Sequence, residues 1–217
     1  MTVRDRTASA RIVAGLRERI LAGELRPGDR VRQEEVAEDF GASRLPVRDA
    51  LRHLEAEGLV RLVASSGAWV ASLSLQECTD AYLIREQVEP LLIEQSLPHL
   101  DAEAIDRLDE LADEMEGADL QTFLKLDREF HLLSFSAARP GMVIDLVHRL
   151  WNTTQHYRRA YALLVGDSRD RTTTAEHRLL VDAARRRSVT DAQAVQRMHV
   201  RRTRLALAEH PELFDAD

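Results

Sequence analysis

The sequence is poor in residues that interrupt or cross-link a chain. Only 9 Gly and 6 Pro occur among 217 residues, and aromatic residues make up 5%, which argues against a barrel or sandwich with many turns and favours long helices. Cysteine occurs once, at Cys78, so no disulfide can form within the chain, as suits a reducing cytosol. We find no signal peptide and no apolar run near the roughly 18 residues that span a bilayer. We therefore expect a soluble cytoplasmic protein without a membrane partner.

Net positive charge is also lacking. The formal net charge is −7 and the pI is about 5.7, which taken alone argues against a nucleic-acid-binding protein. The charge is uneven, however, because residues 1–71 hold 12 Arg and 11 Asp or Glu, whereas the rest of the chain has a net charge of −8. Near the same position, short elements separated by glycines are followed by long helical patterns. We therefore predict two domains, 1–71 and 75–217.

The first domain has the pattern of three helices followed by a hairpin. Helices are expected at 8–22, 33–40 and between Ser43 and Gly58, and strands at 59–63 and 68–71. Ser43 is a suitable N-cap for the third helix, Pro46 falls in its first turn, and Gly58 ends it. A turn is expected at 65–67. Helix, helix, turn, helix and hairpin is the order of elements in a winged helix-turn-helix.

The exposed face of the third helix carries a row of arginines. Arg44, Arg48 and Arg52 stand at i, i+4 and i+8, opposite the apolar face. A helix fits the major groove of DNA, and arginine can pair with guanine edges or phosphates there. Ser43 at the helix N-terminus can receive a phosphate, and Gly67 would let the wing approach the backbone. The alternative is a solvated face on which the arginines pair with neighbouring acidic residues.

Two segments of this domain resemble the GntR family of transcriptional regulators. Residues 20–31, ILAGELRPGDRV, are similar to the opening signature of the family. Residues 43–60, SRLPVRDALRHLEAEGLV, closely resemble its recognition-helix signature. The resemblance covers about 50 residues. It implies a winged helix-turn-helix that binds double-stranded operator DNA.

The resemblance also implies which residues touch the operator. In the family, the arginines matching Arg44 and Arg48 contact DNA, and the glycine matching Gly67 forms the tip of the wing. One departure occurs at 33–35, where this chain has Gln-Glu-Glu and many members have Glu followed by a basic residue. Arg32 is the candidate to replace that contact. The predicted DNA-binding residues are therefore Arg32, Ser43, Arg44, Arg48, Arg52 and Gly67.

The second domain has the pattern of a helical bundle. Helices are expected at about 75–98, 101–116, 119–137, 140–164, 168–187 and 190–209. Thr190 and Gln193 have the spacing of a capping box that would begin the last helix. We therefore predict a mainly α fold, in which an N-terminal winged helix-turn-helix precedes an all-α bundle.

Four residues of this domain are candidate metal ligands. Asp127 and His131, at i and i+4, share one helical face, and His177 and His199 lie in inward registers of the last two helices. One Asp and three His could hold zinc or a similar divalent ion and leave positions open for water or a ligand. The alternative is an ordinary hydrogen-bonded pair, because eight histidines make chance pairs common.

The bundle resembles the FCD effector domain of the FadR subfamily. Metal-binding members carry Asp-x-x-x-His, then a Glu-His pair and a final His about twenty residues later. Asp127 with His131, then His177 after Glu176, and His199 match this order. The resemblance implies a bound divalent metal, with zinc as the first expectation and nickel or manganese as alternatives.

The resemblance extends to effector binding. Residues 82–89, YLIREQVE, are similar to the first-helix signature of the domain, and Arg85 matches an arginine that faces the effector cavity. Its alternative role is a structural ion pair with Glu89 or an acidic neighbour. Asn152 is a second candidate to line the cavity. A metal and an arginine together suit a small carboxylate effector.

These features predict a homodimeric transcriptional regulator, by family analogy a repressor, whose operator affinity depends on a small carboxylate bound at the metal. No catalytic residue is expected. Two alternatives remain at this stage. One is a metal-dependent hydrolase with an appended DNA-binding domain, in which the Asp and His residues activate water. The other is a purely structural metal that stabilises the helical bundle.

Overall fold

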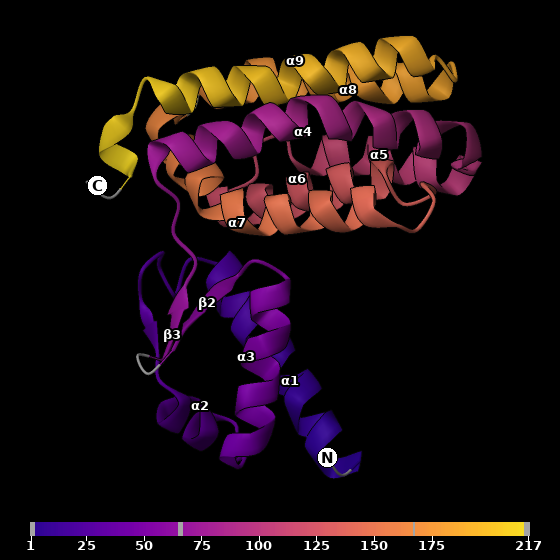
Figure 1. Cartoon of the computed structure of the whole chain (residues 1–217). Coiled ribbons are helices and arrows are strands. Elements are labelled where there is room, and N and C mark those ends of the chain that lie inside the picture. Colours follow the sequence, from indigo (N-terminus) through magenta and orange to yellow (C-terminus); the bar gives the residue numbers. More distant parts are fainter. Residues whose placement is uncertain (1–2, 65–66, 167, 215–217) are drawn as a thin grey trace. The chain divides into compact units, whose positions relative to one another are not determined.

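The computed structural model describes residues 3–64, 67–166 and 168–214, and these residues are mainly helical, as predicted (Figure 1). The chain forms two compact units. One comprises Met1–Ser74 with His148–His156, and the other comprises Leu75–Val147 with Tyr157–Asp217. The long helix α7 therefore contributes residues to both units.

The first unit is built from three helices and a small antiparallel sheet. Its elements are α1 Val3–Leu21, β1 Arg30–Val31, α2 Gln33–Asp39, α3 Arg44–Ala56, β2 Val60–Val63 and β3 Gly67–Val70. The strand order is β1-β3-β2, with Val60 opposite Val70 and Val63 opposite Gly67. The helices and the hairpin were predicted, whereas β1 was not. The expected turn at 65–67 includes Ser65 and Ser66, which lie outside the described residues.

The ends of α3 follow from its local sequence. Ser43 occupies the N-cap position in an extended conformation, although its side chain makes no capping hydrogen bond. Pro46 lies in the first turn, where an amide hydrogen has no helical acceptor. Gly58 follows the C-cap with φ +77°, and Leu59 N–H donates to the carbonyl of Leu54 at 2.9 Å. This left-handed glycine satisfies the last carbonyls of the helix and turns the chain towards β2.

The core of the first unit lies between α1, α3 and the sheet. Ile12, Leu16 and Ile20 form the buried face of α1, and the buried face of α3 is the predicted one, Val47, Ala50, Leu51 and Leu54. Burying the apolar side of α3 leaves its opposite side, with the arginines, exposed to solvent.

The second unit is helical among its described residues. Its elements are α4 Leu75–Ser96, η1 Leu97–His99, α5 Ala102–Glu114, α6 Leu120–Ser134, α7 Met142–Val165, α8 Ser168–Arg185, α9 Val189–Ala208 and η2 Pro211–Leu213. Helix α9 packs along α4 and α8, and α5 packs against α6 and α8 (Figure 1). None of the helices in the described part of the chain has the length and hydropathy needed to cross a bilayer.

The predicted bounds of the last helix agree with the structure to within about one residue, but its predicted capping box was wrong. Helix α9 begins at Val189 with Ser188 as the N-cap, so Thr190 is already inside the helix. Gln193 instead reaches α4, where its amide donates to the carbonyl of Pro90 at 3.0 Å and to Glu94 Oε2 at 3.2 Å. A tertiary contact between α9 and α4 therefore takes the side chain that a local capping box would use.

The turn between α8 and α9 is stabilised from a distance. Arg187 adopts φ +55°, a left-handed conformation that is uncommon for a residue with a side chain. Its guanidinium donates to the carbonyls of Leu97 and Leu100 at 2.8 and 2.6 Å. These hydrogen bonds join the α8–α9 turn to the end of α4 and so help set the register of α9 against α4.

Candidate functional sites

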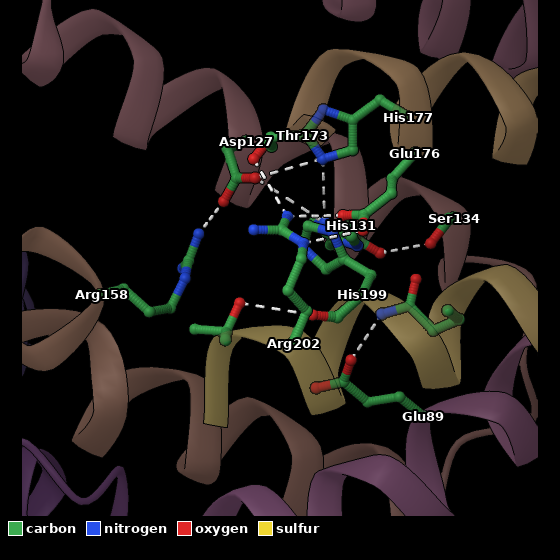
Figure 2. A network of polar contacts seen from close by, with 12 residues as sticks. Glu89, Asp127, His131, Ser134, Arg158, Thr173, Glu176, His177, His199 and Arg202 are labelled. Carbon is green, nitrogen blue, oxygen red and sulfur yellow. Dashed lines mark hydrogen bonds and ion pairs between the residues drawn. The ribbon is translucent and has the colours of Figure 1, made fainter. Parts of the chain in front are cut away.

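The four predicted metal ligands meet in the interior of the helical unit. Asp127 and His131 come from α6, His177 from α8 and His199 from α9, and their ligand atoms all lie within 4.8 Å of one another (Figure 2). Asp127 Oδ1 is 3.7 Å from His131 Nε2 and 3.3 Å from His177 Nε2. The two Nε2 atoms of His131 and His177 are also 3.3 Å apart. The structure thus brings together residues separated by up to 72 positions in the sequence.

These distances suit a shared metal ion. Ligand atoms at 2.0–2.1 Å from one tetrahedral zinc ion are about 3.3–3.4 Å from each other. The carboxylate oxygen and the His177 nitrogen already have this separation, as do the two imidazole nitrogens of His131 and His177. One carboxylate oxygen with three imidazoles is also a donor set that divalent zinc or nickel accepts.

Burial holds three of the four candidate ligands in place, whereas His199 is half-buried. Asp127, His131 and His177 are each no more than 2% exposed. Phe130 precedes His131 on α6. Its ring packs edge-on against the His131 ring, and the ring centres of Phe130 and His177 are 4.6 Å apart. This packing limits the rotation of both imidazoles, so the site is organised by its apolar surroundings as well as by its polar contacts.

The histidines have the protonation state that metal binding requires. Burial lowers the pKa of His131 and His177 well below 6.5, and the positive charge that His199 can carry lowers both further. Burial also lowers the pKa of His199, although Glu176 opposes that shift. Neutral imidazoles are metal ligands, whereas imidazolium ions are not. The cluster therefore needs to lose few protons when a metal binds near neutral pH.

Glu176 contacts this cluster, and the sequence reasoning assigned no role to it. It accepts a hydrogen bond from His199 Nδ1 at 2.7 Å and two from Arg202, at 2.8 and 2.6 Å. Burial raises the pKa of Glu176, but the hydrogen bonds from Arg202 and His199 outweigh it and lower that pKa to about 2. A carboxylate that accepts a hydrogen bond from one imidazole nitrogen leaves the lone pair of the other nitrogen available to a metal. The sequence gives one indication of this contact. His199 and Arg202 are three residues apart on one helix, so both side chains can reach the same carboxylate.

Arg158, on α7, is a second unassigned residue of the site. Its guanidinium forms an ion pair with Asp127 Oδ2, while Oδ1 of the same carboxylate faces His131 and His177. In Figure 2 Arg158 and His177 approach Asp127 from different sides. Burial lowers the pKa of Arg158 to about 10, so the guanidinium stays charged at neutral pH.

A pocket opens beside the cluster. It has an empty volume of about 370 Å³, its open mouth included. The residues that line it are Phe123, Leu124, Asp127, Arg158, Tyr161, Ala162, Thr173, His199, Arg202 and Thr203. Two metal-ligand candidates and two arginines therefore face one space, and the remaining walls combine apolar side chains with three hydroxyl-bearing ones.

The two predicted effector-binding residues are not among those that line this pocket. Arg85 is buried, and its Nε donates to Glu89 Oε1 at 2.6 Å. The second oxygen of Glu89 accepts from Gln196 Nε2, also at 2.6 Å. Arg85 thus makes the structural ion pair that was its alternative role. Neither Arg85 nor Asn152, which belongs to the α7 segment grouped with the first unit, lines the pocket beside the cluster.

The predicted DNA-binding residues lie on the first unit, where all but the half-buried Gly67 are exposed. Arg44, Arg48 and Arg52 line a groove of about 1040 Å³ that also includes Gly67 at the start of β3. Arg44 pairs with Glu34 Oε1 at 3.2 Å, and Arg32 pairs with Glu35 Oε1 at 3.0 Å. Ser43 and Arg32 are exposed as well. Exposed ion pairs of this kind are weak, so the arginines remain able to exchange an acidic neighbour for a phosphate or a base.

Comparison with known sequences agrees with this architecture. Residues 8–70 match the family described as bacterial regulatory proteins, gntR family, and residues 80–202 match the FCD domain. The chain belongs to the GntR family. Members of this family of regulators bind operator DNA, and the exposed arginine row of α3 is therefore on the unit that carries the DNA-binding function.

Relatives and solved structures resemble this GntR-family regulator over most of its length. A Streptomyces ambofaciens "HTH-type transcriptional regulator in unstable DNA locus" is 30% identical over 98% of this chain and 92% of the relative. The Bacillus subtilis regulator YdhC is 29% identical over 80% of this chain and 79% of that protein. The structure of Escherichia coli McbR/YncC has a TM-score of 0.82 at 17% identity and covers 97% of this chain and 99% of that one, so it supports the fold alone.

Proposed function

We propose that this GntR-family regulator is a homodimeric repressor whose operator affinity is controlled by a small carboxylate bound at a divalent metal in its FCD domain. The observation that supports this most directly is the buried cluster of one Asp and three His beside a pocket lined by arginines. Such a pocket combines apolar walls with a few convergent polar groups, as small-molecule sites do.

Asp127, His131, His177 and His199 would hold the metal. A bound zinc or nickel ion supplies positive charge and exchangeable coordination positions at which a carboxylate can bind. The chain's own residues prepare this site in two ways. Glu176 fixes the tautomer and orientation of His199, and the apolar packing around Phe130 orients the other imidazoles.

On the DNA side, α3 would enter the major groove, with Arg44, Arg48 and Arg52 facing bases and phosphates. Two copies of the chain would place two such helices on the half-sites of a pseudo-palindromic operator. Effector binding alters operator affinity only if the effector prefers one arrangement of the two winged helices over another.

A metal-dependent hydrolase needs a general base beside the metal-bound water. Of the described residues that line the pocket, Asp127 is the only carboxylate, and it is itself a candidate ligand. Glu176 has a pKa of about 2 and is held by Arg202 and His199, so it is a poor proton acceptor at neutral pH. These observations favour ligand binding over turnover, and we propose no catalytic role.

The proposal is tested by separate measurements of metal content and DNA binding. The full-length protein is stripped with a chelator and reloaded with Zn²⁺, and bound metal is determined by mass spectrometry. We expect His131→Ala to lose the metal, whereas His99→Ala, an exposed histidine outside the cluster, keeps it. A wild-type protein that binds no divalent ion would contradict the metal assignment.

The effector response is then followed by fluorescence anisotropy on the DNA upstream of the gene. We expect a carboxylate to change operator affinity in the Zn²⁺-loaded wild type but not in His131→Ala. If chelation lowers thermal stability while the carboxylate response persists, the metal is structural and the proposed control of the operator fails. Hydrolysis of an ester, amide or phosphate by the loaded protein would favour the enzyme instead.

A further inference from the structure

The buried charges of the helical unit are balanced in pairs. Among the described residues of this unit, each buried carboxylate has an ion pair with one arginine. The pairs are Glu86 with Arg204, Glu89 with Arg85, Asp127 with Arg158, and Glu176 with Arg202. The interior is thus close to neutral before any metal binds.

A divalent ion in the cluster adds two positive charges that these pairs do not compensate. An uncompensated charge in a poorly solvated site is costly, and a ligand of opposite charge removes that cost. A dianion balances the added charge, whereas a monoanion balances half of it. Charge alone therefore favours a ligand with two carboxylates over a ligand with one.

The pocket offers two arginines for the second carboxylate, and they differ in their other contacts. Arg202 forms its ion pair with Glu176, which is not among the candidate metal ligands. Arg158 contacts Asp127 through Oδ2, and Asp127 is the carboxylate that the metal would share through Oδ1. A metal on Asp127 withdraws negative charge from the partner of Arg158, so Arg158 is the arginine whose ion pair the metal weakens.

Resting on the metal site of the proposed function, we propose that Arg158 anchors the effector. It binds one carboxylate of a short dicarboxylate whose other carboxylate binds the metal. Arg158 lines the same pocket as Asp127 and His199, whereas Arg85, the arginine expected from the sequence, pairs with Glu89 outside that pocket. The enclosed part of the pocket is small, so only a short ligand fits there.

The test is calorimetric titration of the full-length, Zn²⁺-loaded protein, freed of excess metal, with malonate, succinate and acetate. We expect the wild type to bind malonate or succinate more tightly than acetate. Arg158→Gln should lower dicarboxylate affinity by about 10-fold to 100-fold, the value of one charge-assisted ion pair, and acetate affinity by much less. Arg159→Gln is the matched control, because Arg159 is the next residue of α7 and pairs with Gln121 at the surface.

Metal content and thermal stability are measured for every variant, so that a lost metal is not mistaken for a lost anchor. Arg158→Lys keeps the charge opposite Asp127 if the glutamine variant fails to fold. Because an ammonium lacks the two-pronged geometry of a guanidinium, we expect this variant to bind the dicarboxylate about threefold to tenfold more weakly.

The outcomes separate this inference from the proposed function. A wild type that binds neither Zn²⁺ nor any of the three carboxylates contradicts the proposed function itself. A wild type that binds both, with dicarboxylate affinities unchanged in the folded Arg158 variants, overturns the assignment of Arg158. Equal affinity for acetate and the dicarboxylates overturns the requirement for a dianion.

Discussion

His199 donates its Nδ1 hydrogen to Glu176 Oε2 across a distance of 2.7 Å. A carboxylate only accepts hydrogen bonds, so this contact assigns the proton to Nδ1 and leaves the lone pair on Nε2. The two residues come from α9 and α8, which pack side by side. The tautomer of a candidate metal ligand is therefore set by a residue on a different helix.

Replacement of Glu176 should weaken metal binding without removing a ligand. Glu176→Gln removes the charge that aligns His199, and loss of such an outer contact lowers metal affinity by about 10-fold to 100-fold. Competition with a chromogenic zinc chelator measures the change. Glu209→Gln, an exposed substitution near the end of α9, serves as the control. Unchanged zinc affinity in Glu176→Gln would show that the orientation of His199 does not depend on this carboxylate.

Removing one partner of the buried Arg85–Glu89 ion pair should destabilise the protein more than removing both partners. Arg85→Met leaves the Glu89 carboxylate without its cation in the interior, which lowers the free energy of unfolding by about 3–5 kcal/mol. The double variant with Glu89→Met should recover most of that loss, because both charges are then absent. Chemical denaturation of the single and double variants gives the coupling energy.

Arg107 provides the comparison at the surface. It contacts Glu110, Glu114 and Glu129, but its side chain is 35% exposed. Arg107→Met should therefore cost no more than about 1 kcal/mol. Equal costs for the Arg85 and Arg107 variants would argue against burial as the source of the difference.

Cys78 should be inert in the folded protein. Burial raises the pKa of its thiol to about 12, and Arg85 only partly opposes that shift. The thiolate is the reactive form, so a disulfide reagent at pH 8 should label the native protein slowly and the guanidinium-unfolded protein at once. Rapid labelling under native conditions would contradict the burial of Cys78.

The raised pKa of the Cys78 thiol should also make the folded protein less stable at alkaline pH. The unfolded thiol ionises at about pH 9 and the folded thiol only near pH 12, so the unfolded state loses its proton first. The free energy of unfolding should fall as the pH rises from about 9 to 12. Cys78→Ala should show a smaller fall over that range in denaturation experiments.

Operator affinity should depend on the arginines of α3 in particular and not on the total charge of the protein. Arg48→Ala should weaken operator binding by about 10-fold or more, since a good arginine–base or arginine–phosphate contact is worth about 1–3 kcal/mol. Arg197→Ala, which removes the same charge from an exposed position on α9, should leave binding unchanged. Anisotropy titrations at several salt concentrations also report the number of phosphate contacts through their slope. Equal effects of the two variants would indicate a general charge effect.

Local sequence determined the helices, the hairpin and the arginine row. The apolar spacing of α3 and the left-handed Gly58 each act within a few residues, so their structural outcome could be read directly. The four candidate metal ligands were also identifiable, because helical periodicity places Asp127 and His131 on one face and the family resemblance supplies His177 and His199. The net charge of −7 excluded only a broadly cationic DNA-binding protein.

Tertiary structure decided which side chains meet. The pairing of β1 with β3 and the contact of Gln193 with α4 depend on how distant segments pack. The same is true of Glu176 beside His199 and of Arg158 beside Asp127. Periodicity indicates that a residue faces the interior, but the neighbour it finds there depends on the register of one helix against the next. The candidate ligands could thus be predicted from the sequence, whereas the groups that contact them, Glu176 and Arg158, emerged only from the fold.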